Sequence, residues 1–327
     1  MRRGKELDSP SIFLGYSFGR GNPEPWKFFN INHLMVNAYD LITRNIAIKD
    51  MHKFLSYRGI LFCDSGGWQI IQGADNVNIK KIISAQKKIN ADFSAVLDHG
   101  LNEKLHFEYL KYYMDKADFD FVPIIPYDIS DSAIKEIKDL IEDPHMIGIG
   151  KLVPLLRPPI DYKELKKAII SIIKIRKYFP ESKIHIFGLG GLYTMLIFFL
   201  IMDSSDTSNW VHDARYGKIR LVGGNGTYST HPRYSLKHIE KEWYNCICPI
   251  CRSYSIDELD ARGIAGMQLR AIHNAWVFIE EEKKMAEIRE TKKYVKYVET
   301  RIKYSTQHRK LFDFVKNQMD RSNLKCY

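Results

Sequence analysis

Three cysteines and one histidine form the pattern in this sequence that most clearly indicates a kind of chemistry. Cys246, Cys248 and Cys251 lie within six residues, and His273 follows in a segment that we expect to be helical. Three thiolates and one imidazole can complete a tetrahedral Zn²⁺ shell with no open position, as in structural zinc sites. The alternative is a set of buried thiols without a ligand. We predict structural zinc that takes no part in catalysis.

Aspartates that follow apolar runs form a second group. Asp64 precedes a Ser-Gly-Gly turn, Asp98 ends the segment FSAVLD, and Asp206 lies in DSSDTSNW. Carboxylates gathered at one place can act as a nucleophile, as a general acid or base, or as acceptors for the N–H groups of a bound base. Each aspartate alone is also typical of a helix cap or a turn. The surrounding segments lack the histidine ligands of metal-dependent barrels, which favours a metal-free covalent mechanism.

Short apolar runs alternate with amphipathic stretches and must position these residues. The stretches carry apolar residues three and four positions apart, as helices that cover a sheet do. This alternation predicts an α/β fold with a parallel sheet, and eight units favour a (β/α)₈ TIM barrel over an open doubly wound sheet. The expected strands are residues 11–17, 34–39, 59–64, 93–98, 119–125, 146–153, 183–188 and a segment near 199–203.

Barrels of this class carry their functional residues at the carboxyl ends of the strands. When several polar residues of one chain share this placement, it argues against each of them being only a helix cap or a turn residue. We expect the following residues at that end: Asp64, Asp98, Gly150 with Lys151, Gly188 with Gly190, and Asp203 with Asp206.

The chain divides into three predicted parts. Residues 1–240 form the catalytic barrel, residues 241–278 a zinc-binding subdomain, and residues 279–327 a basic C-terminal extension of amphipathic helices. The 45% hydrophobic and 27% charged content excludes disorder and a disulfide-stapled miniprotein. The formal net charge of +10 favours a polyanionic partner such as nucleic acid, although coding bias is an alternative explanation.

Nothing in the sequence indicates a membrane or an export signal. The N-terminal segment lacks the apolar core and cleavage pattern of a signal peptide. The longest apolar run, residues 192–202, is shorter than the ~20 residues that span a bilayer. We predict a cytoplasmic protein with no membrane partner.

Five motifs resemble those of the guanine transglycosylases and occur in the same order. They are ILFCDSGGWQII, IGKLVPLL, HIFGLGG, DSSDTSNWVHDARYG, and CICPIC followed by IHN. The resemblance runs from about residue 30 to about residue 280 and is closest to the archaeal tRNA branch. Members of that family exchange a guanine for a 7-deazaguanine in a polynucleotide, on a barrel with a zinc subdomain.

The resemblance implies a role for each matching residue. Asp206 is implied to be the nucleophile that forms a covalent ester with the sugar. Asp64 is implied to contact the base and transfer a proton, and Asp98 to accept hydrogen bonds from the Watson–Crick edge of guanine. Gly150 and Lys151 take the backbone position that donates to the base O6. The turn residues expected to bind substrate are Ser65, Gly66, Gly188 and Gly190.

Two departures from the family pattern concern the base and the polymer. Pro126 and Tyr127 replace a Gln-Gly pair, and Lys151 replaces the second residue of a Gly-Gly pair, so the incoming 7-deazaguanine is not defined. An end at residue 327 leaves no room for the RNA-binding domains of archaeal tRNA enzymes, which favours the DNA-modifying branch. We expect Arg157 and Arg215, with Lys151, to contact phosphates.

Several alternatives remain open from the sequence. The polymer could be tRNA, as in queuosine- or archaeosine-type exchange, or the chain could be a non-catalytic nucleic-acid-binding homologue. An amidohydrolase-like metal site would need strand-end histidines, which only His99 and His185 approximate. The expected partners are DNA or tRNA and a free 7-deazaguanine base, and a homodimer or an accessory protein is also compatible with the sequence.

Overall fold

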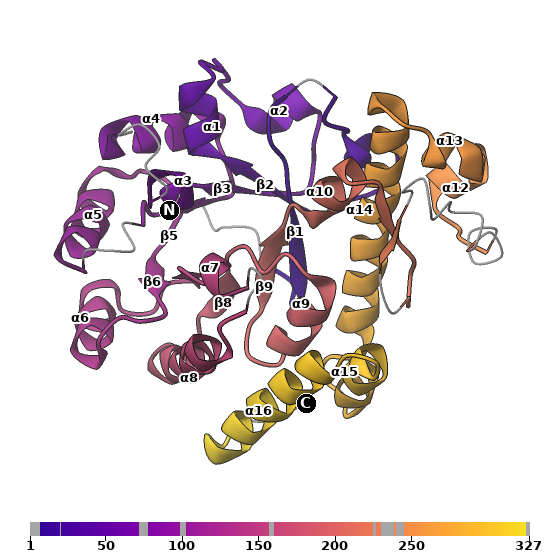
Figure 1. The fold of residues 1–327 in the computed structure, drawn as a ribbon. Coiled ribbons are helices and arrows are strands. Elements are labelled where there is room, and N and C mark those ends of the chain that lie inside the picture. The colour runs from indigo at the N-terminus through magenta and orange to yellow at the C-terminus, as the bar shows by residue number, and fades with distance from the viewer. Residues whose placement is uncertain are drawn as a thin grey trace.

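A curled parallel sheet forms the centre of the molecule. The computed structural model describes residues 7–19, 21–71, 78–98, 103–156, 160–224, 227–229, 239 and 245–324. Nine parallel strands form a nearly closed barrel in the order β5-β4-β3-β2-β1-β9-β8-β7-β6, with helices outside it (Figure 1). The strands are β1 (Ser11–Gly15), β2 (His33–Asn37), β3 (Ile60–Asp64), β4 (Phe93–Ala95), β5 (Phe121–Val122), β6 (Ile124–Pro126), β7 (Met146–Gly150), β8 (Lys183–Ile186) and β9 (Ser204–Thr207).

The barrel has the eight predicted units because two of its strands share one predicted run. Only Pro123 separates β5 from β6, and these two strands are the outer members of the sheet order. Pro123 has no N–H to donate, but its carbonyl oxygen accepts from the Gly148 N–H at 2.9 Å. The chain therefore closes the sheet on itself, and the predicted (β/α)₈ TIM-barrel architecture is confirmed.

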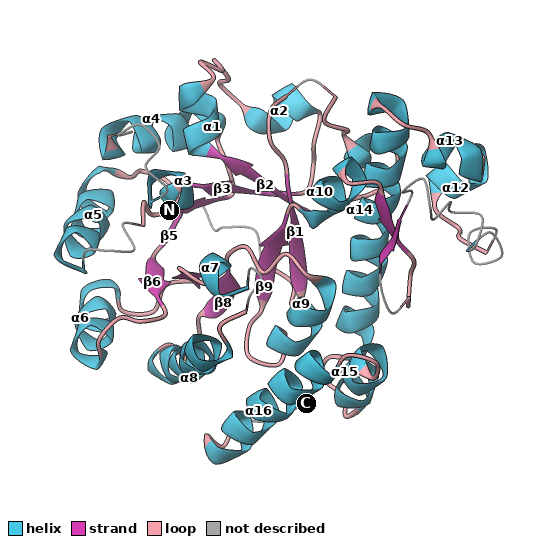
Figure 2. Cartoon of the chain, viewed as in Figure 1, coloured by secondary structure: helices cyan, strands magenta, loops and turns pink. Residues whose placement is uncertain are grey.

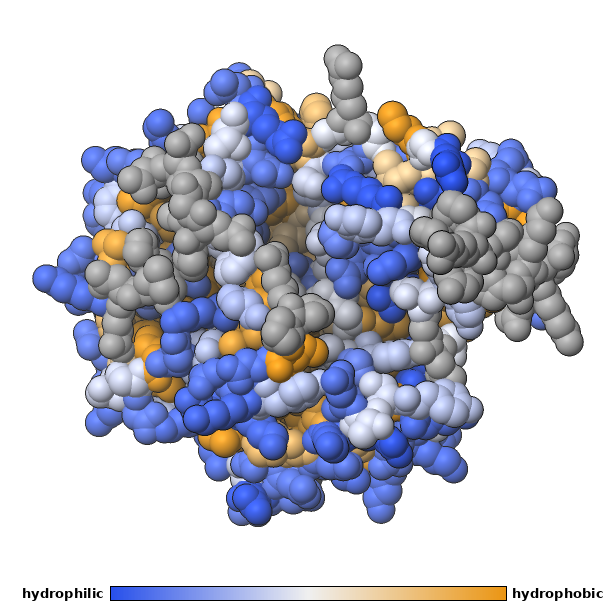
Figure 3. Space-filling view, viewed as in Figure 1, coloured by the Kyte–Doolittle hydropathy of each residue, from blue (hydrophilic) through white to orange (hydrophobic). Residues whose placement is uncertain are grey.

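Helices surround the barrel strands (Figure 2). The buried residues of the longer ones are mostly apolar, as predicted for amphipathic helices. Asn78 caps the N-terminus of α4 (Ile79–Ile89), and Asp161 caps that of α8 (Tyr162–Tyr178). Each of these side chains accepts from the backbone N–H groups of the first turn. Hydrophilic side chains cover most of the outer rim (Figure 3). The other helices around the barrel are α1 (Ala38–Thr43), α2 (Met51–Leu55), α3 (Gly67–Ile71), α5 (Glu103–Lys116), α6 (Asp131–Ile141), α7 (Val153–Leu156), α9 (Leu192–Phe198) and α10 (Asn209–Arg215), with a 3₁₀ helix at Pro25–Lys27.

The last barrel strand lies later in the chain than we predict. Residues 199–203 form the turn after α9, and β9 is the polar segment Ser204–Thr207. Asp203 therefore lies at the amino end of β9, so its expected place beside Asp206 is wrong. Its carboxylate pairs with Arg176 at 2.5 Å and with Arg289 at 3.2 Å. Burial raises the pKa of Asp203, but the two guanidinium groups outweigh burial and lower it to about 2.

The C-terminal part packs against one side of the barrel. A small two-stranded sheet, β10 (Lys218–Arg220) and β11 (Thr227–Ser229), is followed by α12 (Pro249–Ser253), α13 (Ile256–Asp260), α14 (Ile264–Ile288), α15 (Lys293–Ile302) and α16 (Thr306–Arg321). The long helix α14 contacts α10 and β1, whereas α15 and α16 contact α9 (Figure 1). The predicted boundary between residues 278 and 279 falls inside α14. None of the helices in the described ranges combines the length and apolar character of a membrane span.

Candidate active site and metal centre

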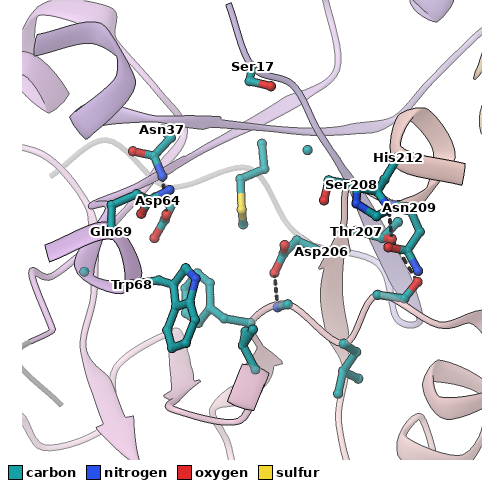
Figure 4. A pocket seen from close by; sticks show the side chains of 18 of the residues that line it. Ser17, Asn37, Asp64, Trp68, Gln69, Asp206, Thr207, Ser208, Asn209 and His212 are labelled. Carbon is teal, nitrogen blue, oxygen red and sulfur yellow. Dashed lines mark hydrogen bonds between the residues drawn. The ribbon is translucent and has the colours of Figure 1, made fainter. Parts of the chain in front are cut away.

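A cavity of about 1000 Å³ opens at the carboxyl ends of the barrel strands. Its wall includes the last residues of β1, β2, β3, β7 and β9, which is where the (β/α)₈ architecture places functional groups. Figure 4 shows Asp64 beside Asn37 on one side of the cavity and Asp206 on the other. The predicted site residues that line this cavity are Asp64, Ser65, Asp98, Gly150, Lys151, Gly188, Gly190 and Asp206.

Other predicted residues lie elsewhere. Gly66 is outside the cavity wall but shapes the turn after β3, with a φ of +88° and an N–H that donates to Asp64 Oδ2 at 3.3 Å. Arg215 on α10 donates to Asn22 at 2.6 Å. Arg157 and His99 lie outside the described residues.

Asp64 carries a carboxyl group that can exchange a proton near neutral pH. Burial raises its pKa, the charge of Asp206 raises it further, and backbone hydrogen bonds from the turn oppose them, which leaves the pKa at about 7. Asn37, at the end of β2, donates to Asp64 Oδ2 at 2.7 Å. A carboxyl held at this pKa suits a general acid and base at neutral pH.

The Asp206 side chain is fixed by the loop after β8. The Gly188 N–H donates to Asp206 Oδ1 at 2.7 Å, as the dashed line in Figure 4 shows. Gly188 has a φ of +69°, and a Cβ there would lie 2.4 Å from Val153 Cγ2, so this position requires glycine. The amide therefore holds one carboxylate oxygen of Asp206, and the second oxygen, Oδ2, is the candidate for bond formation.

Asp98 lies against β7 at the third position of the site. A Cβ on Gly150 would lie 2.5 Å from Asp98 Oδ2, so only glycine allows this approach. Burial raises the pKa of Asp98 to about 6; the positive charge of Lys151 lowers it and the charge of Asp128 raises it. This carboxylate is therefore largely ionised at neutral pH and can accept hydrogen bonds from N–H donors.

Lys151 adopts a backbone conformation that favours glycine. Its φ is +70°, in the left-handed region, and its side chain forms an ion pair with Asp128. Asp128 follows β6, next to the Pro126 and Tyr127 that depart from the family pattern. A lysine–aspartate pair therefore stands beside Asp98, although the sequence alone gives Lys151 no partner.

Several cavity residues escape prediction from the sequence. The rule that strand ends carry functional groups could have identified Asn37, because it is the last residue of β2. Trp68 and Gln69 on α3 and Asn209 and His212 on α10 line the cavity through short helices (Figure 4). These four positions lie within the motifs ILFCDSGGWQII and DSSDTSNWVHDARYG, but the sequence alone gives them no role.

The four predicted metal ligands come together beside α14. Their ligand atoms lie within 4.8 Å of one another. His273 Nδ1 is 3.2 Å from Cys251 Sγ, 3.4 Å from Cys248 Sγ and 3.9 Å from Cys246 Sγ. This set could hold a metal ion, and three sulfur ligands with one nitrogen suit Zn²⁺.

The second nitrogen of His273 supports this assignment. His273 Nε2 lies 2.5 Å from the backbone oxygen of Arg220, to which it can only donate. With the hydrogen on Nε2, the Nδ1 lone pair faces the three sulfur atoms, as a metal ligand requires. The backbone of β10 therefore prepares His273 for metal binding.

The comparisons with known proteins agree with the motifs. No family model matches the chain. The tRNA-guanine(15) transglycosylase of Pyrococcus furiosus is 26% identical over 304 residues, which cover 85% of this chain and 49% of that protein. The same enzyme of Methanosarcina mazei is 25% identical over 321 residues, which cover 90% of this chain and 61% of that protein. The enzyme of Pyrococcus abyssi is 25% identical over an alignment of 342 residues, which covers 97% of this chain and 56% of that protein.

The chain thus spans between 49% and 61% of the length of these curated relatives. The alignments cover between 85% and 97% of this chain. Taken with the barrel and the order of the five motifs, they show that the chain is similar to guanine transglycosylases over most of its length.

Proposed function

We propose that the chain exchanges guanine for a 7-deazaguanine base in a polynucleotide. The observation that carries this proposal is the meeting of Asp64, Asp98 and Asp206 at one cavity, in environments that differ. Asp64 is poised to carry a proton, Asp98 to accept hydrogen bonds, and Asp206 to offer a carboxylate oxygen. The names of the relatives, which are tRNA-guanine transglycosylases, support base exchange.

The first half of the reaction removes guanine. Asp206 Oδ2 forms a bond to C1′ of the sugar while the C1′–N9 bond breaks and its electron pair stays with the base. Asp64, protonated in a large fraction of molecules near pH 7, donates a proton to the departing base, which leaves as neutral guanine. The polymer is then held by an ester to Asp206, with its own backbone intact.

The second half repeats these steps in reverse. The Asp64 carboxylate accepts the N9 proton of the incoming base, and the nitrogen electron pair forms the new bond to C1′. The C1′–Oδ2 bond breaks and its electrons return to Asp206. No oxidant, reductant or metal is needed, and both aspartates regain their initial protonation states.

Asp98 and the backbone of β7 supply base recognition. The carboxylate of Asp98 accepts from the N–H groups on the Watson–Crick edge of guanine, and the backbone at Gly150 and Lys151 donates to O6. Because β7 lies against Asp98, donor and acceptors lie on one wall of the cavity. The target nucleotide must leave its stack to reach this wall.

For the polymer we propose DNA, with tRNA as the second candidate because the relatives carry that name. Zinc is our proposal for the ion at the Cys246, Cys248, Cys251 and His273 cluster. When bound there, zinc supplies folding free energy to the surrounding small core and takes no part in base exchange. A cytoplasmic location stays a prediction.

Incorporation of labelled guanine tests the function and the polymer together. Purified protein is incubated at low salt with radiolabelled guanine and with duplex DNA, single-stranded DNA or bulk tRNA. We expect label in one class of polymer with the wild-type chain and none with Asp206→Asn. Label in tRNA alone would replace DNA by tRNA in the proposal. A folded wild-type protein that labels none of the three polymers would refute base exchange.

A further inference from the structure

A buried histidine lies directly behind Asp206 and has no assigned role. His185 is on β8, is fully buried, and pairs in register with Ser204 of β9. Side chains two residues apart on a strand share one face, so Ser204 and Asp206 both face the barrel interior beside His185. His185 Nε2 lies 3.6 Å from Asp206 Oδ1. This is the oxygen that also accepts from the Gly188 N–H.

Aromatic rings fix the orientation of this imidazole. The ring centroids of Phe13, Phe62 and Phe187 lie 5.6, 5.0 and 4.5 Å from that of His185. These rings leave the imidazole no route to another rotamer without disturbing the barrel core. The His185 side chain is fully buried, which shields its side of the contact with Asp206 from water and strengthens the electrostatic interaction between the two groups.

The partner of the other ring nitrogen defines which nitrogen carries the hydrogen. Burial lowers the pKa of His185, against the opposing effect of Asp206, so the ring is neutral and has one N–H. His185 Nδ1 lies 2.9 Å from Ser204 Oγ, a hydroxyl that can donate or accept. A hydrogen on Nδ1 would turn the Nε2 lone pair toward the Asp206 carboxylate, which is repulsive. With Ser204 as the donor, the Nε2–H faces Asp206 Oδ1.

We propose that His185 is a positioning residue that donates its Nε2–H to Asp206 Oδ1 and so orients the nucleophile for base exchange. This inference rests on the proposed function. The distance of 3.6 Å is longer than a hydrogen bond, and such contacts often tighten when substrate binds. Two donors on Oδ1 leave Oδ2 to attack C1′. When the ester breaks, they stabilise the charge that returns to the carboxylate.

Other charged groups near Asp206 would also influence how the rate of base exchange depends on pH. The charge of Asp206 raises the pKa of Asp64 on β3, and Asp98 follows β4. Lys151 follows β7, and His212 and Asp213 on α10 line the same cavity. The test must therefore vary His185 alone and leave these groups in place.

Four variants separate a positioning role from a packing role. His185→Phe keeps the ring volume and removes the donor. A glutamine amide reaches the place of Nε2, whereas an asparagine amide reaches only that of Nδ1, so His185→Gln should rescue and His185→Asn should not. His33→Gln is the matched control, because His33 is equally buried beside Phe13 but pairs with Glu282.

The first measurement is the rate of covalent adduct formation across pH. Loss of one hydrogen bond to a charged group corresponds to about tenfold or more. We therefore expect at least a tenfold lower rate in His185→Phe and His185→Asn, with the acid limb of the profile moved to higher pH. His185→Gln and His33→Gln should keep the wild-type profile. A wild-type profile in His185→Phe would overturn the proposal, as would higher activity in His185→Asn than in His185→Gln.

The second measurement does not depend on activity. ¹⁵N chemical shifts of histidine report which ring nitrogen carries the hydrogen in the wild-type chain. We expect the Nε2–H form for His185, a shift of this N–H signal in Asp206→Asn, and a mixture of the two forms in Ser204→Ala. An Nδ1–H form in the wild type would overturn the inference. If no polymer gives an adduct but the Nε2–H form is found, the proposed function fails and the contact with Asp206 stands.

Discussion

Replacing Asp64 by asparagine should remove a pH dependence from the stability of the folded chain. Burial and the charge of Asp206 raise the pKa of Asp64 from 3.8 to about 7. Between these two values the folded chain keeps a proton that the unfolded chain has released. The free energy of unfolding therefore falls as the pH rises through this window, and the loss is complete above the folded pKa.

The size of the effect follows from the pKa difference. One pKa unit corresponds to about 1.4 kcal/mol. Between pH 5 and the folded pKa of about 7 lie roughly two pH units. On going from pH 5 to pH 8, Asp64 should therefore lower the free energy of unfolding of the wild-type chain by about 2–3 kcal/mol. Asparagine at position 64 can still accept from Asn37 through its amide oxygen, but it does not ionise. The stability gained in Asp64→Asn should therefore be about 2–3 kcal/mol larger at pH 8 than at pH 5.

Urea unfolding of both proteins at the two pH values measures this difference. Effects that do not depend on pH cancel in the comparison, as do titrations elsewhere that the two proteins share. Asp320→Asn, at an exposed position on α16, is the matched control and should show no change in the difference. Equal gains in the free energy of unfolding at pH 5 and pH 8 for Asp64→Asn would refute the raised pKa of this buried carboxyl, which the proton-transfer role requires.

Three further predictions concern the metal centre, the base and Lys151. Cys248→Ala should lose the bound metal in elemental analysis and lower the free energy of unfolding by ~3 kcal/mol or more, because metal binding is coupled to folding at such sites; an unchanged melting temperature with full metal content would contradict the zinc assignment. Asp98→Ala should raise the KM for guanine by an amount worth ~1–3 kcal/mol, since it leaves base N–H groups unpaired, and steady-state kinetics with unchanged KM would contradict that role. Lys151→Gly should fold with full metal content, because the φ of +70° suits glycine, but should change the ratio of kcat/KM values for guanine and 7-deazaguanine derivatives; an unchanged ratio would remove Lys151 from base selection.

The barrel could be predicted because most of its strands are short apolar runs, separated by longer amphipathic stretches. The exceptions have physical causes. The segment 119–125 reads as one strand, and only the structure shows the division at Pro123. β9 is missed because Ser204 and Asp206 face a polar cavity and a buried histidine, so hydropathy does not mark it. That error also moves Asp203 to the wrong end of the barrel.

The three site aspartates could be predicted from their place after strands and from the family motifs. Their partners could not, because each partner comes from a different strand or loop. Asn37 reaches Asp64 across the pairing of β2 with β3, and His185 reaches Asp206 across that of β8 with β9. Strand pairing and register decide these contacts, and neither is written in a local motif.

The covalent ester on Asp206 is the most direct consequence of the proposed reaction. The wild-type chain is incubated with DNA or tRNA in the absence of an incoming base, quenched in acid, and digested with nuclease and protease. Fragmentation of the peptide by mass spectrometry then assigns the attached sugar to a residue. We expect the added mass on Asp206, and none in Asp206→Asn. A sugar found on Asp203, on Asp64 or on no residue of a protein that still exchanges base would contradict the mechanism.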